Sequence, residues 1–376
     1  MLKIKLPYLL TVIVSVLLLF IGHNIAVNGM INLQNVPQEV VRAKVQNVTE
    51  RIRQDDDFDK PVSMLDEKIF FEAKITSGIR KGEIVTALQN TAGFSPGAQR
   101  EVYRNAAILL INSNDEWYFN GFIRINRLLG LGIMFVLFVL LFGGKKGFNT
   151  ILSLGLTCTA IFSVFVPAIL SGKNIYVMSL LVCAYMVVVT PLIVIGYNKK
   201  SLASVAGCAG GVMIAGIIAL IMDKALYFTG IVDEHSWYLV NLPGNMQLNL
   251  RAVIFAGIII GAMGAIMDVS ISLSSALWEV KEKAHTITFR ELLRSGFTIG
   301  RDIMGTMADT LILAYIGSSL TVVLLLSVFS GSLVSLFNSE MIAVEIVQAL
   351  AGSFGILFAM PLTALFCSVF YLKNKQ

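Results

Sequence analysis

Eight long runs of apolar residues constrain this chain more than any other feature of its sequence. Each run is close to the roughly 20 residues that an α-helix needs to cross the hydrocarbon core of a bilayer. The runs cover residues 8–26, 127–142, 149–170, 175–197, 202–222, 252–276, 303–329 and 341–372. The last run is long enough to be tilted, or broken near Pro361. The pattern predicts a mostly α-helical membrane bundle with about eight transmembrane helices.

Composition agrees with a multi-pass membrane protein and excludes several other classes. Hydrophobic residues make up 56% of the chain and charged residues only 14%, against roughly a quarter charged in soluble proteins. These values exclude an ordinary soluble protein and a disordered one. The net charge of +5 is small, so we expect membrane lipid as a partner and no nucleic acid.

The metal-binding residue types show no ligand pattern. The cysteines lie within apolar runs and form no CxxC pair, and the histidines are far apart; they are Cys158, Cys183, Cys208, Cys367, His23, His235 and His285. We therefore expect packing cysteines, with no disulfide framework, no metal and no cofactor. The P-loop pattern GxxxxGK[ST] is also missing, so the sequence gives no support for ATP hydrolysis.

The basic residues predict how the chain is threaded through the membrane. With the N-terminus in the cytoplasm, the outer short loops receive only Lys173, Lys224 and Arg251. The cytoplasmic side receives the others: Lys3, Lys5, Lys145, Lys146, Lys199, Lys200, Lys281, Lys283, Arg290, Arg294, Arg301, Lys373 and Lys375. This asymmetry predicts that both termini are cytoplasmic. Because no small-residue cleavage site follows the first run, we expect an uncleaved anchor.

The polar segment after the first run is expected to form a domain outside the membrane. Its sequence contains five strand-like stretches separated by turn signals: 40–48, 68–75, 82–89, 106–112 and 117–125. We expect a small antiparallel β-barrel or sandwich that acts as a binding or docking module. The division is then an anchor helix (1–26), an extracytoplasmic β-rich domain (27–122) and a seven-helix bundle (123–376).

An acidic cluster in this domain, Asp55-Asp56-Asp57-Phe58-Asp59, could bind a divalent cation. It lacks the glycine and the distal glutamate of a calcium loop. A solvated loop is the preferred interpretation.

A polar face on the sixth run carries the functional hypothesis. Its members recur every three or four residues: Gly257, Gly261, Gly264, Asp268, Ser272, Ser275 and Glu279. That spacing places them on one side of a helix. The glycines predict close helix packing, and a carboxylate at membrane depth should face the bundle or a wet cavity.

The next two runs add polar residues. Asp302, Thr306, Asp309 and Thr310 form a second polar face, and the eighth run carries Glu345, Gln348 and Gly352. No intramembrane Lys or Arg pairs with Asp268, Asp309 or Glu345. These acids either bind protons or cations during transport, or hydrogen-bond to polar neighbours as packing groups.

The loop between the sixth and seventh runs predicts a short amphipathic helix on the cytoplasmic surface. Thr288 followed by Glu291 has the spacing of a capping box, and Phe289, Leu292 and Phe297 could form an apolar face. Such a helix could couple a soluble partner to the bundle or simply close the loop.

Three segments give the chain a family resemblance. GAMGAIMDVSISLSSALWE (261–279), GRDIMGTMADTLILAYIG (300–317) and EIVQALAGSFGILFAMPLTAL (345–365) resemble the YibE/F-like family of bacterial multi-pass membrane proteins. The motifs lie within residues 257–365. The resemblance implies a bacterial cytoplasmic membrane protein, and a homologous membrane partner or a homo-oligomer. In that family Asn is frequent at the position of Asp309, so a strict proton-carrier role for Asp309 is disfavoured.

The leading functional hypothesis is a secondary transporter or permease component rather than an enzyme. Its proton, ion or substrate path would use Asp268, Ser272, Ser275, Thr306, Asp309, Thr310 and Glu345. The alternative is a non-transporting protein of envelope assembly or sensing, whose outer domain binds a partner. An intramembrane aspartyl protease using Asp268 and Asp309 is disfavoured, because the GxGD pattern of that class is missing.

Overall fold

The computed structural model describes residues 6–28, 39–54, 66–91, 100–113, 115–232, 234–240, 248–284, 286–329 and 332–372. Two compact units share the chain, and each is treated by itself. One unit is Asn32–Phe138, and the other combines Met1–Ile31 with Val139–Gln376. The acidic cluster at 55–59 and His285 lie outside the described residues.

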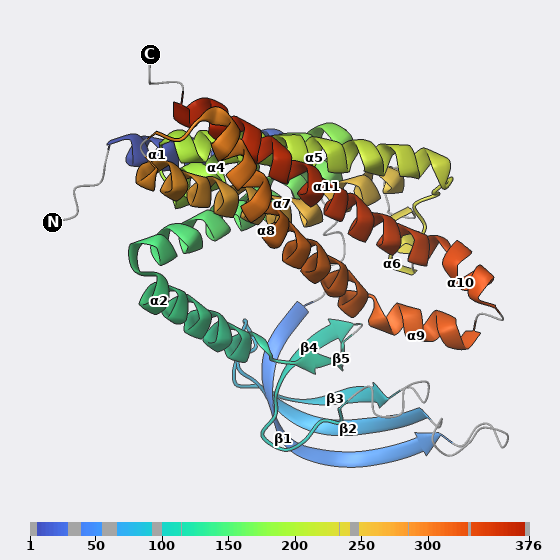
Figure 1. Ribbon diagram of the computed structural model, residues 1–376. Helices are drawn as coiled ribbons and strands as arrows, with labels where there is room; N and C mark the ends of the chain where they lie inside the picture. Colours follow the sequence, from blue (N-terminus) through green and yellow to red (C-terminus); the bar gives the residue numbers. More distant parts are fainter. Residues whose placement is uncertain are drawn as a thin grey trace. The chain divides into compact units, whose positions relative to one another are not determined.

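The smaller unit contains a closed five-stranded barrel (Figure 1). Its strands are β1 (Glu39–Gln54), β2 (Asp66–Ile75), β3 (Ile84–Thr91), β4 (Ala107–Ser113) and β5 (Glu116–Phe122). Their order around the barrel is β1-β2-β3-β5-β4. All pairings are antiparallel except that of β3 with β5, which is parallel. Of the two predicted alternatives, a barrel or a sandwich, the barrel is confirmed.

Alternation along the strands builds the barrel core. Val41, Ala43 and Val45 point inward from the first half of β1, and Phe71 and Ile108 meet them from β2 and β4. Register shifts after Val45 and again after Val48 bend β1, so that its second half pairs with β2 alone. One long bent strand therefore serves two parts of the barrel wall.

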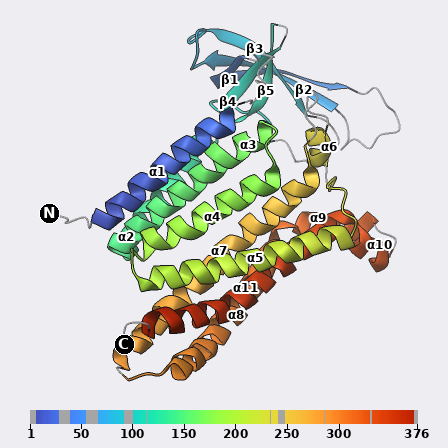
Figure 2. The same ribbon diagram turned by 90° about the horizontal axis from the view of Figure 1, so that it is seen from above.

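The larger unit is helical (Figure 2). Its elements are α1 (Leu6–Val27), the second part of α2 (Ile125–Thr159), the π-helix η2 (Ala160–Phe165), α3 (Val166–Leu170), α4 (Ile175–Val194), α5 (Lys199–Ala225), α6 (Glu234–Val240), α7 (Leu250–Lys283), α8 (Phe289–Ser318), α9 (Leu320–Phe329), α10 (Leu333–Asn338) and α11 (Glu340–Leu372). Six helical stretches among the described residues are long and apolar enough to cross a membrane: 6–27, 125–170, 175–194, 199–225, 250–283 and 340–372.

The second of these stretches contains a sharp reversal. Gly144 has φ 53° and ψ −127°, a conformation that side-chain-bearing residues rarely adopt. After the reversal, a Cβ on Gly147 would meet the carbonyl oxygen of Val139. The chain therefore turns back on itself between two helical arms. This turn coincides with the predicted break between the second and third apolar runs.

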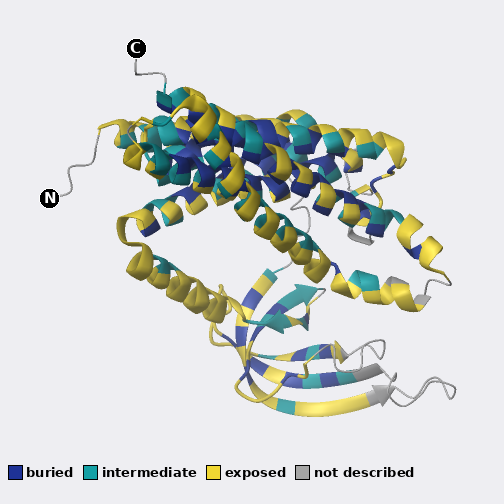
Figure 3. Ribbon diagram, viewed as in Figure 1, coloured by how far each residue is buried: buried dark blue, intermediate teal, exposed yellow. Residues whose placement is uncertain are grey.

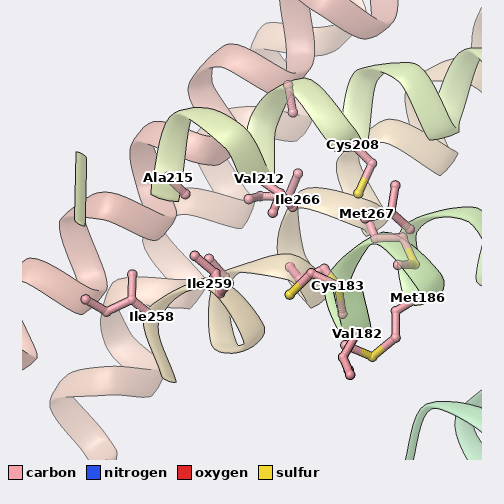
Figure 4. Close-up of a cluster of buried hydrophobic side chains, with 14 of the residues drawn as sticks. Val182, Cys183, Met186, Cys208, Val212, Ala215, Ile258, Ile259, Ile266 and Met267 are labelled. Atoms are coloured by element: carbon pink, nitrogen blue, oxygen red, sulfur yellow. The ribbon is translucent and has the colours of Figure 1, made fainter. Parts of the chain in front are cut away.

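Packing between α5, α7 and α11 forms the centre of the helical unit. Figure 4 shows buried side chains that α4, α5 and α7 contribute to this core. Gly207 and Gly211 on α5 allow close approach, because a Cβ on Gly207 would lie 1.9 Å from Thr363 Oγ1 of α11. Ile266 of α7 fills the space between Gly211 and Gly355. Without a hydrophobic force between helices inside a bilayer, such small-residue contacts are a main source of helix association.

The structure corrects the expected ends of two helices. The loop helix and the seventh run were expected as separate elements, yet Phe289–Ser318 is one continuous helix, and the run ends in a separate helix, α9. Gly296 contacts Ala364 and Gly300 contacts Met360, so this helix packs on α11 from its second turn onward. Of the two alternatives for the last run, a tilt or a break near Pro361, the break is not found, because α11 continues through Pro361.

Candidate functional site

The polar side of α7 points away from the packed centre of the bundle. Gly257, Gly261, Gly264, Asp268 and Ser272 are all exposed within the chain, and we call this set the open face of α7. Ser275 is half-buried and Glu279 is exposed. Of the two expected environments, the bundle or a wet cavity, the packed interior of the described chain is not where this side lies. The reason is competition for the interior: the larger apolar side chains of Ile266, Leu273 and Leu277 occupy it.

The glycines of this face differ in their surroundings. A Cβ on Gly257 or Gly264 would meet no other described atom within 4 Å. Close packing predicted from these two glycines is therefore not found among the described residues. Gly261 does take part in packing, because a Cβ there would lie 2.5 Å from the hydroxyl of Tyr315 on α8.

The polar residues of α8 are exposed in the same way. Asp302, Gly305, Thr306, Asp309 and Thr310 are all exposed, and Figure 3 shows exposed residues along α8. The hydroxyls of Thr306 and Thr310 donate to backbone carbonyls one turn earlier in α8. Among the described residues, no hydrogen bond or ion pair joins Asp268 to Asp309. The two predicted faces are thus both open, and their acids are not brought into contact.

A third group lies near the start of α11. Glu345 is half-buried, and Gln348 lies one turn further along the helix. The amide of Gln348 and the hydroxyl of Tyr315 both lie against Gly261. Gly352, one turn deeper, contacts Leu311 of α8 and Ala262 of α7. The predicted polar side of α11 therefore meets the open face of α7 at Gly261.

A buried hydroxyl network was missed by the sequence reasoning. Ser204 of α5 lies 2.6 Å from Ser274 of α7, oxygen to oxygen. Thr363 of α11 donates to Ser270 at 3.2 Å, and Tyr371 donates to the backbone carbonyl of Ser274 at 2.8 Å. All five side chains are buried. The α7 serines in the interior are thus Ser270 and Ser274, whereas the predicted pair was Ser272 and Ser275.

Charged side chains make contacts where α5 ends and where α7 and α11 begin. Arg251 Nη2 lies 2.5 Å from Asp223 Oδ2, and its Nε donates to the other carboxylate oxygen at 3.0 Å. The pair borders a cleft of about 400 Å³ that Tyr176 and Phe255 also line. Nearby, Glu340 accepts hydrogen bonds from the backbone of Thr229 and Gly230. These contacts tie the start of α7 to the end of α5 and the start of α11 to the segment after α5.

In the described part of the chain, no three His, Cys, Asp or Glu side chains lie close enough together to hold a metal ion. Cys183, Cys208 and Cys367 are buried and Cys158 is exposed, and all four are free thiols.

The comparison with protein families settles the kinship of this chain. Residues 131–373 match the model of the YibE/F-like protein family. The chain belongs to this family. The matched region begins in α2 and includes the open face of α7, the polar face of α8 and the start of α11, whereas α1 and the barrel lie outside it. Searches of curated proteins and of solved structures gave no match.

Sequence periodicity found the polar faces of this YibE/F-like protein but not their direction. A 3.6-residue period states which residues share a side, and it does not state which side faces protein. Ser270 and Ser274 also have a helical spacing of four. The sequence signal that these two serines are buried was their position on α7, opposite the glycines and on the same side as Ile266 and Leu277.

Proposed function

We propose that this protein is a membrane-embedded permease component rather than an enzyme, and that it crosses the membrane eight times. Two crossings are added to the six long apolar helices. The reversal at Gly144 divides residues 125–170 into two crossings. The part of α8 from Gly300 onward runs beside α7 and α11, with Gly300 against Leu273 and Tyr315 against Gly261, and it forms the other.

The ends of the helices support the orientation with cytoplasmic termini. At one end of the helical unit Tyr8 of α1 donates to Asn149, while Lys200 and Lys281 both lie over the ring of Trp278. The basic residues of the described chain that belong to this end are Lys145, Lys146, Lys199, Lys200, Lys281, Lys283, Arg290 and Arg294. The other end has Lys173, Lys224 and Arg251. Under the positive-inside rule this distribution supports a cytoplasmic first end, and we propose that the barrel lies outside the membrane.

The single observation that carries the proposal is the exposed position of Asp268. It lies near the middle of α7, a 34-residue helix, and its side chain is exposed within the chain, although Tyr315 of α8 reaches Gly261 on the same face. An Asp at the centre of a membrane helix costs roughly 2.5–3.5 kcal/mol on insertion scales. Facing lipid would leave this cost uncompensated. Water, protein or both must therefore reach this side in the membrane.

A second copy or a homologous chain is the proposed cover. Gly257 and Gly264 leave room beside Asp268, because a Cβ on either would touch nothing. Small residues of this kind let a neighbouring helix approach closely. We place the open face of α7 and the polar face of α8 at this subunit interface. A path between subunits, lined by Asp268, Ser272, Thr306 and Asp309, would carry a proton or a cation coupled to transport.

Ion movement through proteoliposomes tests the function. Liposomes containing a trapped pH-sensitive dye receive a potassium diffusion potential, and the rate of internal pH change is recorded. The wild-type protein should conduct protons faster than protein-free liposomes, and Asp268→Asn should reduce this rate to near background. Glu279→Gln is the matched control, since Glu279 is on the same side of α7 but near its end. Equal rates for the wild type and Asp268→Asn would contradict the proposal.

Cysteine crosslinking tests the interface. In a variant in which all four native cysteines are replaced by serine, Ser272→Cys should form a disulfide-linked dimer in native membranes. Phe162→Cys is the control, because Phe162 is 72% exposed on η2, away from the open face. Equal crosslinking at both positions would argue against an interface on α7.

A further inference from the structure

The barrel is closed by a short seam between β3 and β5. Only Ala87 with Trp117 and Leu88 with Tyr118 are paired across this seam. Beyond Leu88, β3 continues to Thr91 with β2 as its partner. Beyond Tyr118, β5 continues to Phe122 with β4 as its partner. Each strand therefore has one edge without a ladder partner among the described residues.

The backbone of Phe122 points to this open edge. Ile123 donates its N–H to the carbonyl of Ala107 at 2.9 Å. In an antiparallel ladder a bond in this position flanks a non-hydrogen-bonded pair, which here is Ile108 with Phe122. The N–H and C=O groups of such a pair point away from the partner strand. The N–H and C=O of Phe122 are thus directed away from β4. Unpaired groups of this kind are a template for an added strand.

A cleft of about 1000 Å³ lies along the same edge. Its walls include Leu88 and Asn90 of β3 and Tyr118, Phe119 and Phe122 of β5. The ring of Phe122 is stacked with Tyr103 at 5.9 Å between centroids and meets Phe119 edge to face at 5.2 Å. The cleft therefore combines a strand edge with an aromatic wall.

A buried amide fixes the far wall of the cleft. Gln89 is 1% exposed, accepts the N–H of Val102 at 2.8 Å and donates to the carbonyl of Arg100 at 3.2 Å. This holds the segment 100–103 across the barrel end. Glu101 in that segment forms an ion pair with Arg51 of β1 at 3.0 Å. The wall is thus built into the barrel by two independent contacts.

The charges of the cleft are mostly positive. Arg51, Arg100 and Arg124 line it, and the acid among the lining residues, Glu101, is the partner of Arg51. Arg100 and Arg124 are exposed, which leaves two guanidinium groups available to bind carboxylates in bidentate geometry.

We propose that this cleft binds an extended acidic peptide segment, which adds to the free edge of β5 through the backbone of Phe122 while Arg100 and Arg124 bind its carboxylates. A strand edge supplies affinity through main-chain hydrogen bonds, and alternate side chains enter neighbouring pockets. An oligosaccharide or a nucleic acid would also accept aromatic and arginine contacts, but neither uses the strand edge. The open edge is therefore the observation that favours a peptide.

Fluorescence anisotropy on the full-length protein in detergent tests the site. The probe is a short fluorescein-labelled peptide that alternates valine with glutamate, and the same peptide with lysine for glutamate is its control. The acidic probe should bind and the lysine probe should not. The double variant Arg100→Glu/Arg124→Glu should weaken binding about tenfold or more, since charged hydrogen bonds are lost. Lys81→Glu, in the β2–β3 turn, is the matched charge control and should bind as the wild type does.

Hydrogen exchange supplies the second readout. Saturating acidic peptide should slow amide exchange in residues 119–123 and leave exchange in β1 unchanged. Equal binding of the two peptides, or binding insensitive to the double variant, would overturn the proposal. Displacement of the probe by a sulfated oligosaccharide without protection of residues 119–123 would reassign the cleft to a glycan. Failure of the acidic peptide to bind at all would also refute it.

Discussion

The hydroxyl oxygens of Ser204 on α5 and Ser274 on α7 lie 2.6 Å apart in the buried centre of the bundle. Ser204 can also reach the backbone carbonyl of Ser270, at 3.3 Å. Tyr371 on α11 completes the link by donating to the carbonyl of Ser274. Hydroxyl groups that are buried from water thus join three helices, α5, α7 and α11. In an apolar medium such groups are costly if left unpaired.

This contact predicts a measurable coupling between two serines. Ser204→Ala and Ser274→Ala should each destabilise the protein, and the double variant should lose less than the sum of the two. The coupling energy should be about 0.6 kcal/mol, the mean for interhelical hydrogen bonds in a membrane protein. Unfolding by a denaturing detergent measures all four proteins. Ser272→Ala, on the open face of the same helix, is the control and should lie within about 0.5 kcal/mol of the wild type. Additive single effects would contradict the contact.

The seam between α5 and α11 predicts a strong effect of one added methyl group. Gly207→Ala would place a Cβ 1.9 Å from Thr363 Oγ1 and 2.9 Å from the Thr363 Cα, which belongs to the backbone. The two helices must then separate, at a cost of about 1–3 kcal/mol typical of overpacking. Gly155→Ala is the matched control, since a Cβ at Gly155 meets nothing within 4 Å. That control should be neutral or stabilising by up to about 1 kcal/mol. Thermal unfolding in detergent compares them.

Much of the fold follows from local patterns, as individual elements show. The start of α8 was readable because Thr288 and Glu291 supply the capping box that the helix uses. The five strands could be predicted from alternation, since inward residues such as Ala43 and Ala73 are flanked by polar ones. That α8 is one continuous helix could not be predicted from the sequence. The polar residues near Arg301 suggested an end there, whereas contacts of Gly296 and Gly300 with α11 hold the helix together.

The site was less predictable because direction depends on partners far away in the sequence. Asp268 and Ser272 share a side of α7, as their spacing requires. Whether that side faces protein depends on α5 and α11, which take the opposite side through Gly211 and Gly355. Likewise nothing local to Gln89 indicates that its amide holds Val102, because the contact is made by tertiary packing.

Gln89 predicts how strongly the barrel depends on one buried amide. Gln89→Leu would preserve much of the volume but remove the acceptor of the Val102 N–H. A buried donor without a partner costs about 1–3 kcal/mol, so the barrel should be destabilised by that amount. Limited proteolysis of the full-length protein at rising temperature reports the effect. Thr86→Ala, at an exposed position of the same strand, should stay within about 0.5 kcal/mol of the wild type. Equal resistance of Gln89→Leu and the wild type would contradict this role.

The cap of α8 predicts a pH-dependent contribution to stability. The N–H and hydroxyl of Thr288 both donate to Glu291, each at 2.8 Å, and these bonds lower the pKa of Glu291 from its ordinary value of 4.5. A carboxyl group with a lowered pKa in the folded state stabilises that state above pH 4.5, and the contribution is lost as the pH falls through the folded pKa.

Thr288→Ala should therefore destabilise α8 by about 1 kcal/mol at pH 7, the usual cost of losing an N-cap, and by clearly less at strongly acidic pH. Detergent unfolding at the two pH values measures the difference. Thr298→Ala is the control: its hydroxyl donates to the carbonyl of Arg294 and has no titrating partner, so its effect should be the same at both pH values. A Thr288→Ala effect that does not change with pH would show that the bond from the Thr288 hydroxyl to the Glu291 carboxylate contributes nothing to the cap.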